Sequence, residues 1–186
     1  MKNIKYLLQF IFVMFFFGIF KIIGLKNSKY LSGNLMTLLG PLFRSKKIVF
    51  SNLSKAFPNL DDIEKEKISK KMWFNYGRIF AEYMFIKEFR NNPKESNNII
   101  IENPKVLEKI KTYSHPVIFV SGHFNNFELM AMEIERSGID LAAVYRPLNN
   151  KFINPLMENI RTKYICKKQI KKGLTGTKEL LLNFKR

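Results

Sequence analysis

The sequence is poor in the residues that build disulfides and metal sites. It contains one cysteine, Cys166, and two histidines, His115 and His123, among 186 residues. A single cysteine excludes an internal disulfide and any multi-cysteine metal site, and Cys166 is predicted to be a buried or half-buried structural thiol. The histidines do not form a His-Glu-x-x-His pattern, so a metal site is disfavoured and no cofactor is expected.

Acidic residues and arginine are also scarce. The chain has 15 acidic residues against 32 basic ones, a formal net charge of +17, and only seven of the basic residues are arginine. This excess favours anionic partners, such as acidic lipid head groups or an acidic protein. Proteins that read nucleic-acid sequence rely on arginine and carry recognisable modules. Since the chain shows neither feature, no nucleic-acid partner is expected.

Apolar residues are abundant and gather in one long run. Residues 6–20 contain one strongly polar side chain, Gln9, and the run extends through Leu25 if the Lys21 side chain reaches back to the interface. About 20 apolar residues span a bilayer, so residues 1–25 are predicted to be an uncleaved, single-pass membrane anchor. The alternative is a buried helix of a soluble core. Basic residues are more numerous after this run than before it, which favours a main domain that faces the cytoplasm.

The remaining residues, 26–186, are predicted to form one α/β domain. Residues 31–60 show no clear pattern, whereas residues 61–89 have helical spacing, with Asp61 and Asp62 suited to the first turn. In the second half, predicted strands alternate with predicted helices. Strands are expected at residues 99–101, 117–121, 141–145 and 165–170, and helices at 104–111, 126–136, 155–163 and 177–184. This alternation indicates βαβ units and a largely parallel sheet.

The stretch "SGHFNNFELM" (121–130) places a histidine and a glutamate just after a predicted strand. On one helix His123 and Glu128 would lie about 140° apart, so they meet only if His123 is in the loop and Glu128 in the first helical turn. Gly122 is expected to give that loop its freedom, and Asn125 to cap the helix. Glu128 is then either the partner of His123 or the acid of a capping box, and His123 by itself has the alternative of an ordinary loop residue.

A second polar stretch, "VYRPLNN" (144–150), ends the next predicted strand with Arg146, Asn149 and Asn150. Ligands of parallel sheets bind at the carboxyl ends of the strands. This rule predicts that His123 and Arg146 lie at the same rim, with Arg146 as an anion clamp. The alternative is an ordinary turn, because proline and asparagine are common turn residues.

Together these segments resemble the late acyltransferases of lipid A biosynthesis, the lauroyl and myristoyl branch related to the glycerolipid acyltransferases. The His-x4-Glu pattern and "VYRPLNN" carry the resemblance. The N-terminal apolar segment, "SNLSKAFPNL" (51–60) and "NYGRIFAEY" (75–83) also resemble that family, and they occur in the same order as in its members. The resemblance implies a glycerolipid-acyltransferase-like fold. Family members usually continue with further sheet, so we expect a fold that is incomplete at the C-terminus. We also expect the 186 residues alone to be poorly stable and to show little or no activity.

The resemblance further implies a membrane-bound enzyme that moves a fatty acyl chain from acyl carrier protein to a hydroxyl of an anionic lipid A precursor. His123 would be the general base, and Glu128 would orient its ring and stabilise the imidazolium. Arg146 would hold a phosphate or sugar-acid group, with Asn149 and Asn150 positioning the loop or the acceptor. Two alternatives stay open: a glycerophospholipid acyltransferase, whose motif more often has Asp in place of Glu128, and a non-catalytic membrane-associated fragment.

Overall fold

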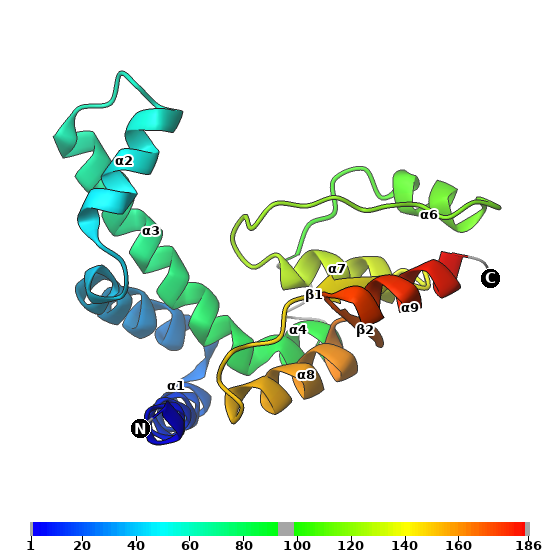
Figure 1. Cartoon of the computed structure of the whole chain (residues 1–186), viewed down its shortest axis with the longest axis horizontal. Helices are drawn as coiled ribbons and strands as arrows, with labels where there is room; N and C mark the ends of the chain where they lie inside the picture. Colours follow the sequence, from blue (N-terminus) through cyan, green and yellow to red (C-terminus); the bar gives the residue numbers. More distant parts are fainter. Residues whose placement is uncertain (1, 93–98, 185–186) are drawn as a thin grey trace. The chain divides into compact units, whose positions relative to one another are not determined.

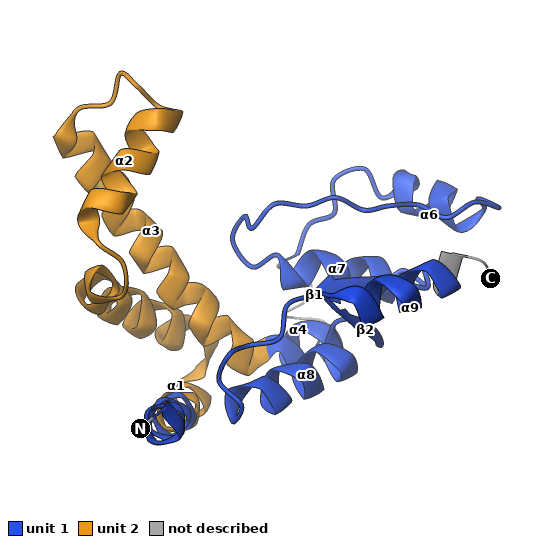
Figure 2. Cartoon of the chain, in the orientation of Figure 1, with its two compact units in different colours: residues 1–14, 86–186 blue, residues 15–85 orange. Residues whose placement is uncertain are grey.

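A computed structural model of the chain describes residues 2–92 and 99–184. The elements follow in the order α1 (Lys2–Phe43), α2 (Lys46–Ala56), α3 (Asp62–Glu82), the 3-10 helix η1 (Tyr83–Phe85), α4 (Ile86–Asn91), α6 (Lys105–Lys111), α7 (Glu128–Arg136), β1 (Ala142–Tyr145), α8 (Ile153–Tyr164), β2 (Lys168–Lys171) and α9 (Leu174–Phe184) (Figure 1). The chain divides into two compact units, unit 1 with residues 1–14 and 86–186 and unit 2 with residues 15–85 (Figure 2).

The apolar N-terminal run forms helix α1, which continues well past residue 25 and contributes to both units. Gly24 interrupts its helical backbone with φ 77° and ψ 167°, a conformation that essentially only glycine adopts without strain. Within the described residues α1 is the one helix long and apolar enough to cross a membrane, and only 11% of its most apolar 18-residue stretch is buried. A core helix of a soluble protein would be mostly buried, so this exposure fits a membrane anchor better.

Helix α3 begins where the sequence predicts. The Asp61 side chain accepts a hydrogen bond from the Glu64 backbone at 2.7 Å, and the Glu64 carboxylate accepts one from the Asp61 backbone at 3.1 Å, which completes a capping box. The helical stretch expected at 61–89 is broken by η1 and ends at Asn91. Residues 31–60 are mostly helical despite their unclear pattern, because packing stabilises helices as much as periodicity does.

Small residues bring α1 and α3 into close contact inside unit 2. A Cβ on Gly77 of α3 would lie 2.1 Å from the carbonyl oxygen of Ser32, and one on Gly40 would lie 2.2 Å from the ring of Trp73. Trp73 is buried in this contact. The predicted core face of residues 61–89 therefore meets α1 at glycine positions where a larger residue would force its neighbours to shift.

The sheet of unit 1 is smaller than predicted. Strands β1 and β2 pair in parallel, with Ala142 opposite Lys168 and Tyr145 opposite Lys171, and α8 connects them. This βαβ unit and the α/β class are confirmed. The strands expected at 99–101 and 117–121 are wrong, since neither segment pairs with a strand in the described chain. An isolated extended segment gains no ladder hydrogen bonds, and Ile118 and Val120 are 75% and 88% exposed.

Apolar side chains of α4, α7, α8 and β2 form the core of unit 1. The predicted structural thiol is confirmed, because Cys166 is buried and its Sγ lies 2.8 Å from the carbonyl oxygen of Leu141. Burial raises the pKa of this thiol. The helices expected at 104–111, 126–136, 155–163 and 177–184 correspond to α6, α7, α8 and α9, with ends shifted by up to a few residues.

Candidate active site

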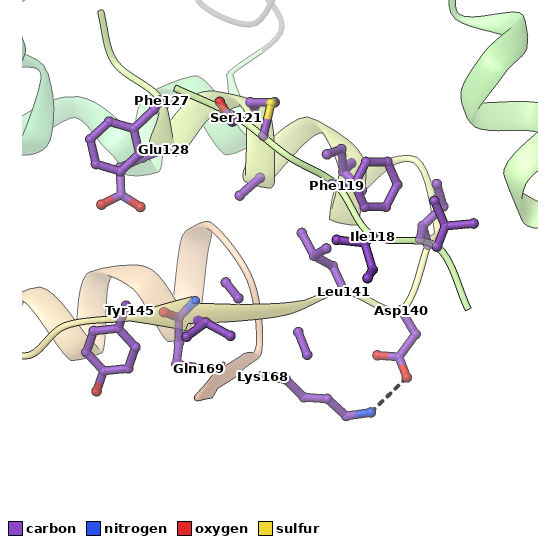
Figure 3. A pocket seen from close by; sticks show the side chains of 18 of the residues that line it. Ile118, Phe119, Ser121, Phe127, Glu128, Asp140, Leu141, Tyr145, Lys168 and Gln169 are labelled. Carbon is purple, nitrogen blue, oxygen red and sulfur yellow. Dashed lines mark hydrogen bonds and ion pairs between the residues drawn. The ribbon is translucent and has the colours of Figure 1, made fainter. Parts of the chain in front are cut away.

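A cavity of about 680 Å³ in unit 1 brings His123, Glu128, Tyr145 and Arg161 together. The extended segment before α7 lines one side of it, and β1 lines the other (Figure 3). Glu128 and Tyr145 lie toward one end, whereas Ile118, Phe119 and Leu141 gather toward the other (Figure 3). Asp140 and Lys168, which form an ion pair at 2.8 Å, lie at this second end too, so apolar side chains gather there beside two charged ones (Figure 3).

His123 lies in the loop before α7, as predicted, with an exposed side chain. Its ring meets the ring of Phe127 edge-on, with centroids 4.4 Å apart. The left-handed residue of the loop is Asn125, with φ 51°, and not Gly122. The prediction for Gly122 was wrong because asparagine also tolerates this conformation. A Cβ on Gly122 would instead meet the Phe124 ring at 2.5 Å.

Glu128 is the first residue of α7, and it is only 6% exposed. The capping-box interpretation is wrong, since Phe127 occupies the N-cap position and no side chain caps the helix. One carboxylate oxygen, Oε1, accepts two hydrogen bonds from Arg161, from Nε at 2.8 Å and from Nη2 at 2.5 Å. The structure thus places Glu128 in the same cavity as His123 but orients its carboxylate through Arg161, and no hydrogen bond joins Glu128 to His123.

Arg161 is the residue of this site that sequence reasoning missed. It lies on α8, 33 residues after Glu128, inside an ordinary-looking helical segment. Its side chain is 12% exposed and that of Glu128 is 8% exposed, so the ion pair is largely removed from water. The one available signal was its position on α8, four residues after the buried Met157 and therefore on the same face of the helix.

Tyr145, at the end of β1, presents the face of its ring to the guanidinium of Arg161. The guanidinium carbon of Arg161 is 5.6 Å from the centre of the Tyr145 ring. The Tyr145 hydroxyl donates a hydrogen bond to Oε1 of Glu158 at 2.5 Å, and Lys171 pairs with the same oxygen at 3.1 Å. Burial, and then the contact with Glu158, raises the pKa of Tyr145 to about 12. The phenol is therefore protonated at neutral pH and is not a base.

The stretch "VYRPLNN" divides into exposed and buried parts. Arg146 and Asn149 are exposed, and Arg146 is not among the residues that line the cavity. The shared rim expected for His123 and Arg146 is therefore not formed, because the segment before His123 does not join the sheet.

Asn150 is buried and makes four contacts within the chain. Its Nδ2 donates to the Tyr6 carbonyl at 2.9 Å and to the Gln9 side chain at 3.1 Å. Its Oδ1 accepts from the backbones of Phe152 and Ile153, at the start of α8, at 3.0 and 3.2 Å. Asn150 thus fixes the loop after β1 to the N-terminal part of α1, which also explains the polar Gln9 in the apolar run.

Metal-binding groups do not gather in the described part of the chain: residues 2–92 and 99–184 contain no cluster of three or more His, Cys, Asp or Glu side chains that could hold an ion. Besides the phenol of Tyr145, the ionisable groups that line the cavity are instead the imidazoles of His115 and His123, the carboxylates of Glu128 and Asp140, the guanidinium of Arg161 and the ammonium of Lys168. These groups suit proton transfer to or from a substrate hydroxyl.

Comparison with known proteins identifies the family. The family model of bacterial lipid A biosynthesis acyltransferases matches residues 1–173, a range that includes His123, Glu128, Tyr145 and Arg161. No curated protein and no solved structure matches the chain. Since the family model covers more than half of the 186 residues, the chain belongs to the bacterial lipid A biosynthesis acyltransferase family.

Proposed function

We propose that this protein transfers a fatty acyl chain from acyl carrier protein to a hydroxyl of a lipid A precursor, with His123 as the general base. The observation that carries the proposal is a cavity that His123, buried Glu128 and a majority of apolar residues line together. The family match supports the same reaction class.

In the proposed reaction, neutral His123 removes the proton of the acceptor hydroxyl while the oxygen attacks the thioester carbonyl. The tetrahedral intermediate then collapses, the carbon–sulfur bond breaks, and the proton on His123 passes to the leaving thiolate. The carboxylate of Glu128 stabilises the transient imidazolium through its charge. Arg161 fixes the orientation of that carboxylate through two hydrogen bonds to one oxygen.

The acyl chain binds along the apolar walls of the cavity. Val117, Ile118 and Phe119 line one side, and Leu141 and Ala142 line the other. A cavity of about 680 Å³ that apolar residues line for the most part suits a ligand with a hydrocarbon chain. We infer that the thioester carbonyl of the donor lies within reach of His123.

The surroundings of the site suit anionic, membrane-borne partners. A net charge of +17 attracts both an acidic carrier protein and an anionic lipid precursor. Exposed Arg146 binds a phosphate or sugar-acid group of the acceptor, with Asn149 beside it, while Asn150 positions the loop through Gln9. Helix α1 holds the protein in the inner membrane, with the catalytic unit facing the cytoplasm.

The acceptor class is tested with membranes that contain this chain and with two acceptors in parallel. The donor is acyl carrier protein that bears a radiolabelled acyl chain. A tetra-acylated lipid A precursor should become labelled, whereas a lysophospholipid should not. Labelling of the lysophospholipid alone would overturn the proposed acceptor and favour a glycerophospholipid acyltransferase.

A further inference from the structure

We propose that Tyr145 is a positioning residue of this site, because its ring supports the guanidinium of Arg161, which in turn holds the carboxylate of Glu128. The mechanism above does not require Tyr145. Its side chain contacts Glu158 and Arg161, which are not the proposed base, His123, or the carboxylate beside it, Glu128. Its effect on catalysis rests on the proposed function, whereas its effect on Arg161 is a property of the fold alone.

The geometry places the ring where it can restrain Arg161. Glu158 and Arg161 are three residues apart on α8, so they lie on the same face of that helix, and both face the end of β1. The guanidinium carbon lies 5.6 Å from the Tyr145 ring centre, within the range of a cation–π contact. Since the Arg161 side chain is only 12% exposed, water weakens this contact less than it would at a surface.

The ring of Tyr145 is itself held at both ends. Its backbone belongs to the ladder of β1 and β2, where it stands opposite Lys171. Its hydroxyl donates to Glu158 at 2.5 Å, and Lys171 pairs with the same Glu158 oxygen at 3.1 Å. Contacts therefore run from β2 through α8 and β1 to Arg161, and from there to Glu128 on α7.

This support matters because arginine is long and has many rotamers. Two hydrogen bonds from Nε and Nη2 reach one oxygen of Glu128, and they form together only if the guanidinium plane keeps one orientation. A fixed aromatic ring against the guanidinium limits the alternatives. Without it, Arg161 should sample positions that release Glu128 and move its charge relative to His123.

The first test measures the accessibility of Arg161 and needs no enzymatic turnover. The detergent-solubilised full chain is treated with phenylglyoxal, and the modification rate of each arginine is followed by mass spectrometry. Exposed Arg146 is the reference for reagent reactivity. Arg90, which bonds to Glu135 and to the Met132 carbonyl at 3.3 Å, is the reference for an intact fold. In the native chain Arg161 should react much more slowly than Arg146.

Tyr145→Leu should raise the Arg161 rate about 2- to 30-fold, the range that corresponds to loss of a cation–π contact, with Arg90 unchanged. Tyr145→Phe keeps the ring and should restore most of the protection. Tyr113→Leu, at a half-exposed tyrosine elsewhere in the unit, is the matched control and should change nothing. The proposal would be overturned if Arg161 in Tyr145→Leu reacted as slowly as in the native chain. It would also be overturned if Tyr145→Leu and Tyr145→Phe lost the same protection of Arg161.

Glu158→Ala gives a second measurement if Tyr145→Leu also exposes Arg90 and so fails to fold. It leaves the tyrosine ring in place but removes the acceptor of its hydroxyl, so the Arg161 rate should rise by a smaller factor than in Tyr145→Leu. An unchanged rate in Glu158→Ala would show that the network does not restrain Arg161.

The second test uses acyl transfer. Tyr145→Leu should lower kcat by a factor similar to the change in Arg161 reactivity and leave the acceptor KM within about twofold, with recovery in Tyr145→Phe. A raised KM with native kcat would mean that Tyr145 contacts substrate and does not position Glu128. If the native chain transfers no acyl group, the proposed function fails, while the Arg161 rates still decide whether Tyr145 supports Arg161.

Discussion

At the scale of residues, the candidate site contains the buried ion pair of Glu128 and Arg161. The sequence predicts His123 in a loop and Glu128 in the first turn of the next helix, and the structure has both residues there. The partner of Glu128 was not predictable, since Arg161 is 33 residues away and only the packing of α8 against α7 brings it close. A capping box with Asn125 has the right spacing, but the Glu128 carboxylate accepts hydrogen bonds from Arg161 instead, because these charge-assisted bonds are stronger.

Glu128→Gln should destabilise the protein by about 3 to 5 kcal/mol, because the buried guanidinium loses its carboxylate partner. Transfer should also be severely slowed. The double variant Glu128→Gln/Arg161→Met should regain most of the stability but none of the activity. Chemical denaturation compares these with Glu108→Gln, whose exposed pair with Lys111 should be worth no more than about 1 kcal/mol. Full activity in Glu128→Gln would show that its charge is not needed.

The contact between Tyr145 and Glu158 should make the stability of the protein depend on pH. The hydrogen bond from Tyr145 lowers the pKa of Glu158 below its ordinary value of 4.5. A lowered pKa adds stability that is complete above 4.5 and is lost as the pH falls through the lowered value. The difference in Tm between the native chain and Glu158→Gln should therefore be constant between about pH 7 and pH 5 and shrink at lower pH. A difference that persists unchanged to the lowest pH would refute this role.

At the scale of elements, helices were easier to predict than strands. The capping residues at Asp61 and Glu64 are local signals, and α3 starts where they place it. A strand needs a partner that the local sequence does not specify. The apolar residues 117–121 and 142–145 look alike in sequence, yet only the second segment finds a parallel neighbour, β2. The first segment instead forms a wall of the cavity, a role that apolar character alone does not distinguish from a strand.

The close contact of α1 and α3 gives a prediction for Gly77. Alanine normally favours a helix over glycine by about 1 kcal/mol. Gly77→Ala should nevertheless lower Tm, because its Cβ would lie 2.1 Å from the Ser32 carbonyl oxygen and force the helices apart. Gly18→Ala is the matched control in α1, since a Cβ there meets nothing within 4 Å, and it should leave Tm unchanged or raise it. Equal effects of the two substitutions on thermal unfolding would contradict this packing.

At the scale of the whole molecule, charge and hydrophobicity suggest two modes of attachment to a membrane. The net charge of +17 could hold a protein on an anionic bilayer by itself, whereas the apolar run of α1 would hold it by insertion. Composition alone does not separate these two modes of attachment. They differ in their response to salt, because only charge attraction is screened.

The protein should stay in the membrane fraction after washes with molar salt and with alkaline carbonate. Insertion of the apolar part of α1 does not depend on surface charge, and that stretch is largely exposed in the structure. Immunoblotting of the pellet and supernatant measures the outcome. Quantitative release into the supernatant would refute the anchor and leave a peripheral basic protein.

The central claim, acyl transfer with His123 as the base, is tested most directly by the initial rate of labelled acyl transfer to a lipid A precursor. Membranes with the native chain are compared with His123→Ala, His115→Ala and empty-vector membranes at equal protein levels. The native chain should transfer at a low rate, since little activity is expected of the 186 residues alone, but measurably above the empty-vector background. His123→Ala should lose on the order of 10²–10⁴-fold, the usual effect of removing a general base, while His115→Ala keeps most of the activity. Equal transfer by the native chain and His123→Ala, or no transfer above background by the native chain, would contradict the account.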